Sequence, residues 1–434
     1  MYEPPTRLLR VDLDDETVES QQVPDEWRRR FVGGKGLGAR YLYDELDAGV
    51  DPLGGENALL FVLGPLSGVL PGDPRYAVVT KSPLTGAFLD SYGGGTFPER
   101  LVGALGDHLG VLVTGVADRP VRLDVADGTA RIRPAEDLWG EDTRATDTAF
   151  PDASVACIGP AGERLVRYAT IASDGGEHQA GRGGAGAVMG SKRLKAVVAR
   201  GRPPDALQEL RDRLTDRFTD DERNEWYLSS ETLETVDFAD EIGALATRGW
   251  QEREFDGADG IGIEAARSAA SERERRDDPI PGGFRVETDA GESVPRGATP
   301  MSLGAGLGID DFDAVAALGE TCDRLGIDVI SAGTAVAWAI RADVAADLGR
   351  DLDFGDPDDA RRLLEDIAAR ETELGDALAD GVARAARQYG GGDLVPTVKG
   401  MALPAYDPRG AVGMALAYAT SDRGACHRRA LPVE

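Results

Sequence analysis

The sequence predicts an α+β protein: a strand-rich N-terminal domain, a helical domain, and the beginning of an incomplete third helical domain. Up to residue 202, short apolar runs alternate with clusters of turn residues, which is typical of strands. After the breaker Gly201-Arg202-Pro203-Pro204, apolar residues recur at helical spacing. We therefore expect domains at 1–202 and 203–392, and an incomplete C-terminal domain at 393–434 that is too short for its own core.

The first domain opens with a predicted hairpin, because residues 8–13 alternate as a strand and 17–23 follow them across an acidic turn. Short helices are expected at 26–31 and from Lys35 onward. The apolar run 59–63 predicts a buried strand, and 74–91 predicts a strand, a turn and a return strand. Further strands are expected at 111–114, 121–125, 130–133, 155–158 and 168–172.

The second domain is predicted from seven stretches in which apolar residues recur every three or four positions. These predicted helices are 206–218, 230–247, 263–276, 312–326, 332–348, 359–370 and 375–388. We expect the segment after them to dock on the other domains, or to introduce a domain of which the sequence holds only the start.

The charge balance excludes two classes of partner. The 434 residues carry 77 Asp and Glu against 48 Lys and Arg, a net charge of −29. Nucleic acid and anionic membranes are therefore not expected partners. Only five of the basic residues are lysines. An acidic, lysine-poor composition favours a protein adapted to high salt, such as a haloarchaeal one, because salt screens the repulsion; the alternative is an acidic protein from a GC-rich genome.

The three cysteines, Cys157, Cys322 and Cys426, are far apart, and no C-x-x-C pair exists. A disulfide framework is therefore not expected, nor is a metal site built from local cysteine pairs. No apolar run reaches the length of a membrane span, and no signal segment opens the chain. We expect a cytoplasmic protein.

The stretch 181–192 is the strongest local motif, with five glycines and Arg182 within ten residues. Glycine permits close backbone approach, and free amides beside a guanidinium suit an anion such as phosphate. The pattern G-x-G-x-x-G is present, but neither a preceding strand nor a later acidic residue supports a dinucleotide site. A Walker loop fails because a serine separates the last glycine from the lysine. A tight packing turn without ligand is the alternative interpretation.

Nine stretches in order along the chain resemble one family, the aldehyde ferredoxin oxidoreductases. They are GGKGLGARYLYDEL (33–46), GPLSG (64–68), RYAVVTKSPLTGAFLDS (75–91), GPAGE (159–163), AGRGGAGAVMGSKRLKAV (180–197), LGAGLGIDD (303–311), CDRLGIDVIS (322–331), LPAYDPRG (403–410) and YATSDRGACHRR (418–429). The resemblance implies oxidation of an aldehyde to a carboxylic acid at a tungsten or molybdenum bis-pterin centre, with electrons passed to ferredoxin through a [4Fe–4S] cluster.

The resemblance also implies residue roles. The residues that would hold the pterin phosphates and their bridging magnesium ion are Arg75, Gly94, Arg182, Gly183 and Gly184. The family's D-x-x-G-L-D pterin loop is matched by Asp323, Ile327 and Asp328, with Ile in place of Leu. A basic pair near the cofactor is matched by Arg423 and Arg429, although the second is usually Lys.

His427 matches a histidine close to the metal, which the resemblance makes a proton donor or a substrate anchor. It is one of three histidines and lies in an arginine-rich setting. The alternative is an ordinary surface histidine beside Arg428.

Two departures from the family pattern concern the cluster and the metal. Where the family has C-x-x-C-x-x-x-C, residues 274–286 contain no cysteine, although an iron–sulfur cluster needs thiolate ligands. Where the family has an acid near the metal, residues 297–300 read Gly-Ala-Thr-Pro. The competing hypothesis is therefore a degenerate, non-catalytic relative or partner subunit. Either way we expect self-association or a complementing subunit.

Overall fold

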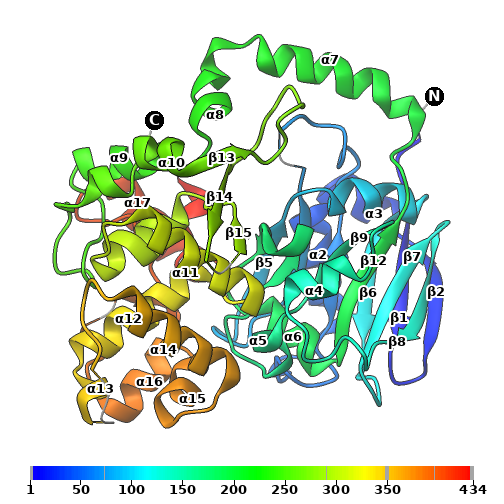
Figure 1. Cartoon of the computed structure of the whole chain (residues 1–434). Coiled ribbons are helices and arrows are strands. Elements are labelled where there is room, and N and C mark those ends of the chain that lie inside the picture. The colour runs from blue at the N-terminus through cyan, green and yellow to red at the C-terminus, as the bar shows by residue number, and fades with distance from the viewer. Residues whose placement is uncertain (1–2, 73, 290, 348–350, 395, 431–434) are drawn as a thin grey trace. The chain divides into compact units, whose positions relative to one another are not determined.

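The computed structural model describes residues 3–72, 74–289, 291–347, 351–394 and 396–430 (Figure 1). By its internal contacts the chain forms two compact units. The first comprises Met1–Asp220 with Arg324–Gly326, and the second comprises Asp221–Asp323 with Ile327–Glu434. Strands dominate the first unit and helices the second, which confirms the predicted α+β class.

Two six-stranded sheets build the first unit. In the first sheet the spatial order is β2 (Thr17–Gln22), β1 (Arg7–Asp12), β6 (His108–Thr114), β3 (Leu59–Val62), β4 (Tyr76–Lys81) and β5 (Phe88–Gly93). In the second it is β11 (His178–Ala180), β10 (Ile171–Ser173), β9 (Ser154–Cys157), β12 (Leu194–Arg200), β7 (Val121–Ala126) and β8 (Thr129–Pro134). Each sheet has one parallel pair, β1 with β6 and β12 with β7. The predicted hairpin of β1 and β2 is confirmed.

The first unit has a core on both faces of its first sheet. Because successive side chains of a strand point to opposite faces, Val78 joins one core and Val79 the other. The larger core also holds Val197 of the second sheet, so it lies between the sheets. This two-sided burial explains why the central strands read as continuous apolar runs rather than as alternating ones.

Short helices complete the first unit. They are α1 (Asp25–Phe31), α2 (Gly34–Glu45), α3 (Phe97–Leu105), α4 (Thr143–Thr148), α5 (Pro160–Glu163), α6 (Ala185–Ser191) and α7 (Gln208–Thr219), with 3₁₀ turns at Asp174–Gly176 and Asp205–Leu207. The sequence predicted a domain boundary after residue 202, whereas this unit extends to Asp220 and so includes helix α7. No side chain of α7 is buried, and Arg211 ties the helix to Glu99.

The second unit is mainly helical. Its elements are η3 (Glu222–Asn224), α8 (Glu225–Ser230), α9 (Glu234–Glu241), η4 (Ala258–Gly260), α10 (Ile263–Ala269), β13 (Ala270–Arg273), β14 (Phe284–Thr288), β15 (Gly291–Ser293), the π-turn η5 (Pro300–Gly304), η6 (Ala305–Leu307), α11 (Phe312–Leu325), α12 (Val329–Arg341), α13 (Val344–Asp347), α14 (Pro357–Ala369), α15 (Glu373–Ala379), α16 (Val382–Tyr389), β16 (Thr397–Val398), β17 (Met401–Ala402), α17 (Val412–Thr420) and η7 (His427–Arg429). The segment 393–434 belongs to this unit.

Four predicted helices of this unit are wrong in extent. The helix predicted at 263–276 ends at Ala269, because the chain then pairs as β13 with β14. The one predicted at 230–247 ends at Glu241, and the chain beyond it bridges to Tyr406. The one predicted at 375–388 is interrupted at Gly381, whose φ of 97° is incompatible with a helix. The one predicted at 332–348 is interrupted as well, because α12 ends at Arg341 and Asp343, with a φ of 55°, separates it from α13. Its last residue, 348, lies outside the described residues.

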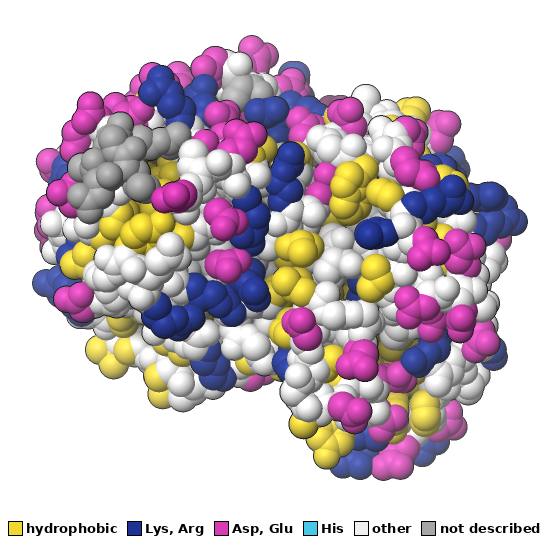
Figure 2. Space-filling view, turned by 90° about the horizontal axis from the view of Figure 1, so that it is seen from below, with side chains coloured by type: hydrophobic (Ala, Val, Ile, Leu, Met, Phe, Trp, Pro, Cys, Tyr) yellow, Lys and Arg dark blue, Asp and Glu magenta, His cyan; other side chains and the backbone are white. Residues whose placement is uncertain are grey.

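Charged side chains of both signs are interspersed on the face shown in Figure 2. None of the helices in the described ranges combines the length and the apolar character that crossing a bilayer requires.

Two lysines are fully buried in the first unit. Lys192 donates to the carbonyls of Gly55 and Gly115, and burial lowers its pKa to about 8. Lys195 pairs with Glu163.

The Lys195–Glu163 pair is expected to be essential for the stability of the first unit. The two atoms Nζ and Oε1 are 2.5 Å apart, and the side chains are 0% and 4% exposed. Lys195→Met leaves a buried carboxylate without its cation, so we expect the free energy of unfolding to fall by about 3–5 kcal/mol. Denaturant titration measures this. Arg30→Met is the matched control, because Arg30 and Glu26 are 67% and 71% exposed, and it should change little. Equal effects in the two variants would contradict the expectation.

Candidate functional site

In the glycine-rich stretch 181–192, the backbone of helix α6 packs directly against the backbone of neighbouring segments. A Cβ on Gly184 would lie 2.2 Å from the carbonyl oxygen of Arg167, and one on Gly186 would lie 2.2 Å from that of Thr170. On Gly190 it would lie 2.0 Å from the oxygen of Gly162. Helix α6 therefore packs directly on main chain, and only glycine permits that approach. These three glycines would be required with or without a ligand.

The turn before α6 is left-handed at three successive residues. The φ angles of Arg182, Gly183 and Gly184 are 69°, 79° and 84°. The turn is held through its carbonyls, since Ser82 donates its hydroxyl to Gly183 O at 2.6 Å and Ser91 donates to Gly181 O. Non-glycine residues seldom adopt such a φ, so these bonds stabilise a costly conformation at Arg182.

The donor chemistry of this turn suits an anion. Gly184 is the N-cap of α6 and has no side chain that could accept from an amide. The amides of Gly186 and Ala187 already donate to the carbonyls of Ala169 and Gly184, so an anion would bind the amides that precede them. Arg182 is only 3% exposed, so its side chain is buried in this acidic protein. Backbone N–H groups and a buried arginine are the groups that bind phosphate oxygens.

The other residues predicted for the phosphate site also lie in the first unit. Gly94 follows β5 and is buried, and its carbonyl accepts from the hydroxyl of Ser173 at 3.1 Å. Arg75 precedes β4 and is exposed. The sequence around Gly94 and Arg182 thus folds into neighbouring turns at the ends of β5 and β11, which Ser91 links.

The predicted pterin loop forms the turn between α11 and α12. Asp328 is the N-cap of α12, and its Oδ2 accepts from the amide and the hydroxyl of Ser331 at 3.1 and 2.5 Å. The amide of buried Ile327 donates to Cys322 O at 2.9 Å. Asp323 is half-buried. Capping alone accounts for an aspartate at position 328.

The C-terminal motif residues lie after α17. Arg423 is 1% exposed, and His427 begins the turn η7 and is half-buried. The side chain of Arg429 lies outside the described residues. The structure therefore places Asp323, Ile327, Asp328, Arg423 and His427 in the second unit.

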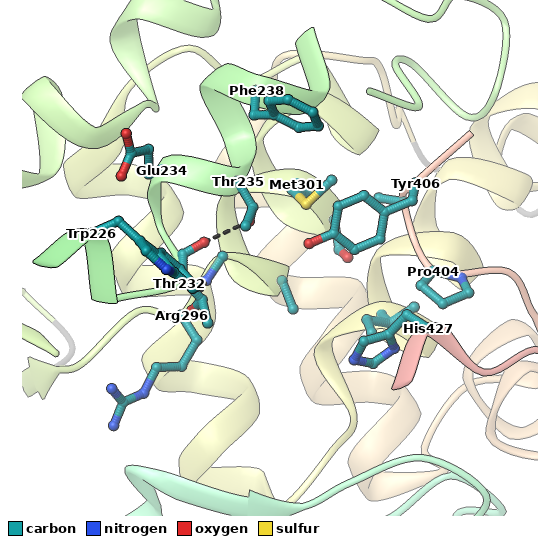
Figure 3. Close-up of a pocket in the computed structure, with 15 residues that line it drawn as sticks. Trp226, Thr232, Glu234, Thr235, Phe238, Arg296, Met301, Pro404, Tyr406 and His427 are labelled. Carbon is teal, nitrogen blue, oxygen red and sulfur yellow. Dashed lines mark hydrogen bonds between the residues drawn. The ribbon is translucent and has the colours of Figure 1, made fainter. Parts of the chain in front are cut away.

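A cavity of about 450 Å³ lies in the second unit, and His427 is on its wall (Figure 3). Apolar side chains form most of this wall. Its lining residues are Trp226, Thr232, Glu234, Thr235, Phe238, Arg296, Gly297, Ala298, Met301, Ser302, Ile330, Pro404, Ala405, Tyr406 and His427. Such a volume is within the usual range for small-molecule sites.

Tyr406 is held rigidly on this wall. Its backbone bridges to Leu245, and its carbonyl accepts from the hydroxyl of Tyr418 at 2.9 Å. Burial raises the pKa of Tyr406, while a hydrogen bond with Thr235 opposes the rise. Its hydroxyl points toward Thr235 and Thr232 in Figure 3. Tyr406 is therefore a neutral phenol at physiological pH, able to donate or accept a hydrogen bond.

Arg296 lies at the edge of the cavity between two carboxylates. Its guanidinium is 2.9 Å from Glu231 Oε1 and 2.8 Å from Glu274 Oε2. Both glutamates are nearly buried, with 7% and 6% of their side chains exposed. In Figure 3 this guanidinium points away from Tyr406 and His427. The guanidinium of Arg296 is thus ion-paired with Glu231 and Glu274 of the protein itself.

The cysteines do not offer a ready metal site. All three are buried, and burial raises the pKa of Cys157 to about 12 and that of Cys322 well above its usual value. Thiolates rather than thiols bind metals. Within the described ranges, no three His, Cys, Asp or Glu side chains are grouped as a metal site would require.

Sequence reasoning missed most of the cavity. Tyr406 lies in a quoted motif, LPAYDPRG, which could have singled it out. Phe238, Met301 and Trp226 come from three separate elements and carry no sequence signal of a site. Only the fold brings them together.

Comparisons with known proteins identify relatives along the whole chain. The family models described as the N-terminal domain and as domains 2 and 3 of aldehyde ferredoxin oxidoreductase match residues 8–201 and 209–434. The tungsten-containing aldehyde ferredoxin oxidoreductases of Pyrococcus furiosus and Thermococcus kodakarensis are each 35% identical, over 97% of this chain and 73% of their own length. The WOR-like subunit of an aliphatic sulfonate oxidoreductase from Pyrococcus furiosus is 30% identical, over 98% of this chain and 75% of that protein.

A solved structure shares the fold. The active site complex BamBC of benzoyl coenzyme A reductase, bound to 1,5-dienoyl-CoA, contains a chain that superposes with a TM-score of 0.80 at 25% identity. The match covers 96% of this chain and 69% of that one. Because both family models match and relatives are 35% identical, the chain belongs to the aldehyde ferredoxin oxidoreductase family of oxidoreductases.

Proposed function

We propose that this protein oxidises an aldehyde to the carboxylic acid at a tungsten or molybdenum bis-pterin centre and passes the electrons to ferredoxin. Family membership supports the reaction class, and the names of the 34–35% identical relatives support tungsten and ferredoxin. The observation that carries the proposal is the position of His427 on the wall of an apolar cavity.

The residues present fit a phosphate-bearing cofactor. The left-handed turn at 182–184 offers backbone amides and a buried guanidinium, which is the donor set that pterin phosphates require. In this proposal Arg182, Gly183 and Gly184, together with Gly94 and Arg75, would hold the pterin phosphates and the magnesium ion that accompanies them. The resemblance also assigns a pterin-binding role to Asp323, Ile327, Asp328 and Arg423.

In this proposal, side chains of the protein bind the substrate and accept the protons that the reaction releases. Oxidation of an aldehyde with one water yields the acid, two electrons and two protons; the bound metal centre supplies the two-electron acceptor. His427 accepts a proton released in the cavity, and Tyr406, kept neutral by burial, donates a hydrogen bond to the substrate oxygen. The apolar wall excludes water, which strengthens both interactions.

Gly297 and Ala298 line the cavity where the resemblance implies an acid. Among the described lining residues, the remaining groups able to exchange protons are His427, Tyr406 and the exposed Glu234. Proton transfer therefore falls to His427 in this proposal.

A second candidate is a catalytic subunit that depends on a partner for electron transfer. The buried, high-pKa thiols of Cys157 and Cys322 favour it, because they are unsuited to hold a cluster. Two relatives support it by name, one as a WOR-like subunit and one as part of the BamBC complex. Ferredoxin or an iron–sulfur subunit would then receive the electrons.

His427→Asn should lower kcat for aldehyde oxidation by about 10²–10⁴-fold, because it removes the group that takes up the proton. The assay follows reduction of a viologen dye by the anaerobically purified protein. His108→Asn is the control: His108 lies in the first unit, hydrogen-bonded to Leu105 O and Ser20, and should leave kcat unchanged. Full activity in the His427 variant would remove this residue from the mechanism.

Arg182→Ala should lower pterin content by about tenfold or more, since a charge-assisted contact contributes about 1.5–3 kcal/mol. Fluorescence of the oxidised pterin released from purified protein measures it. Arg131→Ala, an exposed change on β8, should retain full content. Undiminished pterin in the Arg182 variant would move the phosphate site elsewhere.

A further inference from the structure

We propose that Asp174 is a positioning residue for the anion site that Gly94 and Arg182 form in the first unit. Its carboxylate ties the turn after β5, which contains Gly94, to the hairpin that leads into the Arg182 turn. This inference rests on the proposed pterin-phosphate site and adds to it a residue that acts on the two turns rather than on the cofactor.

The hairpin that leads to Arg182 is short and has a costly backbone. Its strands β10 and β11 have three residues each and pair antiparallel. The turn that joins them begins with Asp174, Gly175 and Gly176, whose φ angles are 51°, 65° and 109°. Non-glycine residues seldom adopt such a φ, so the contacts of Asp174 have to offset its strain. Because only Gly181 separates β11 from Arg182, whatever holds the hairpin also holds the start of the Arg182 turn.

The contacts of Asp174 reach the turn after β5. Its Oδ2 accepts from the amide of Thr96 at 2.7 Å, and its Oδ1 accepts from the hydroxyl of the same threonine at 2.6 Å. Thr96 lies shortly after Gly94 and directly before α3, and its Oγ1 is also 2.8 Å from Ser154 Oγ of β9. Hydrogen bonds to a carboxylate are stronger than those between neutral groups. Both carboxylate oxygens therefore fix main chain that lies 78 residues away in the sequence.

Gly95 lies directly against this carboxylate. Its φ is 74°, and a Cβ there would be 1.7 Å from Asp174 Oδ2. No side chain fits at this position, so the backbone next to Gly94 rests on the hairpin turn. The neighbouring Ser173 donates its hydroxyl to Gly94 O at 3.1 Å. Two adjacent residues of the hairpin thus hold the three successive residues 94–96 of the other turn.

The charge of Asp174 separates a positioning role from an electrostatic one. A negative charge opposes phosphate binding, and its effect is already visible on a neighbour, since burial and the charges of Asp174 and Glu177 raise the pKa of Asp147 to about 6. Asparagine at position 174 would remove this charge. It offers only one oxygen, however, so one of the two donors of Thr96 would lose its acceptor. Positioning therefore predicts that Asp174→Asn weakens the site, whereas charge alone predicts that it strengthens it.

The test measures pterin content and amide exchange on the whole protein, purified from a host that makes the pterin. Asp174→Ala should lower pterin content about tenfold or more and Asp174→Asn about threefold, because they remove two acceptors and one. Hydrogen exchange read by mass spectrometry should become faster in Asp174→Ala in two separate peptides, one covering 94–97 and the other covering 181–184.

Asp107→Ala is the matched control. Asp107 accepts from the amide and the hydroxyl of Thr6 at 3.0 and 3.2 Å, so it engages the same pair of donor groups. It follows the C-terminal end of α3, whereas Thr96 precedes the N-terminal end. Its loss should leave pterin content and the exchange of both peptides unchanged. Thr96→Val removes only the hydroxyl and keeps the test decisive where Asp174→Ala fails to fold. Thr96→Ser restores the hydroxyl and should recover the pterin that Thr96→Val loses.

Exchange at 181–184 that stays at the wild-type rate in Asp174→Ala overturns the inference, as does pterin content in Asp174→Asn at or above that of the wild type. Equal pterin losses in Asp174→Ala and Asp107→Ala overturn it too, because they reflect stability alone. Faster exchange in both peptides, from protein whose wild type carries no pterin, refutes the proposed cofactor and leaves the link between the two turns in place.

Discussion

The first unit depends on how closely α6 approaches the backbone beneath it. Gly184, Gly186 and Gly190 each have a carbonyl oxygen where a side chain would begin. A side chain at any of these positions would overlap a carbonyl oxygen, so glycine is required for the helix to pack this closely. The turn immediately before the helix is left-handed, and the side chain of Arg182 in this turn is buried. The packing interpretation and the ligand interpretation of this stretch are therefore compatible: glycine is required for packing, and Arg182 and the amides of the turn would bind the anion in the proposed site.

Much of the fold could be predicted because its signals are local. The run Leu59–Val62 is apolar throughout since both faces of its sheet are covered, and the β1–β2 hairpin follows from alternation and an acidic turn. The prediction failed where strand pairing with a distant segment overrides helical periodicity. At Ala270 the chain pairs with β14 instead of continuing α10, and after Glu241 it forms a β-bridge with Tyr406. The turn at Gly381 shows the third cause, a backbone conformation that periodicity does not report.

In the candidate site, too, the residues within continuous motifs could be predicted and those brought together by the fold could not. Arg182, Asp328 and His427 lie in continuous motifs, so resemblance could single them out, although the structure also gives Asp328 a capping role. The cavity wall could not be predicted, since Trp226, Phe238 and Met301 lie on separate elements and look like ordinary core residues. Nor does the sequence show that Arg296 is paired with two carboxylates 22 and 65 residues away.

The central claim is that this chain supports pterin-bound metal chemistry without holding an iron–sulfur cluster through its own thiolates. Elemental analysis of the anaerobically purified 434-residue protein tests it most directly, with tungsten, molybdenum, iron and acid-labile sulfide determined on one sample. The account predicts tungsten or molybdenum approaching one atom per chain, with iron and sulfide well below the roughly four of a [4Fe–4S] cluster. Iron and sulfide near four per chain, or protein that carries neither tungsten nor molybdenum after expression in a host that makes the pterin, would contradict it.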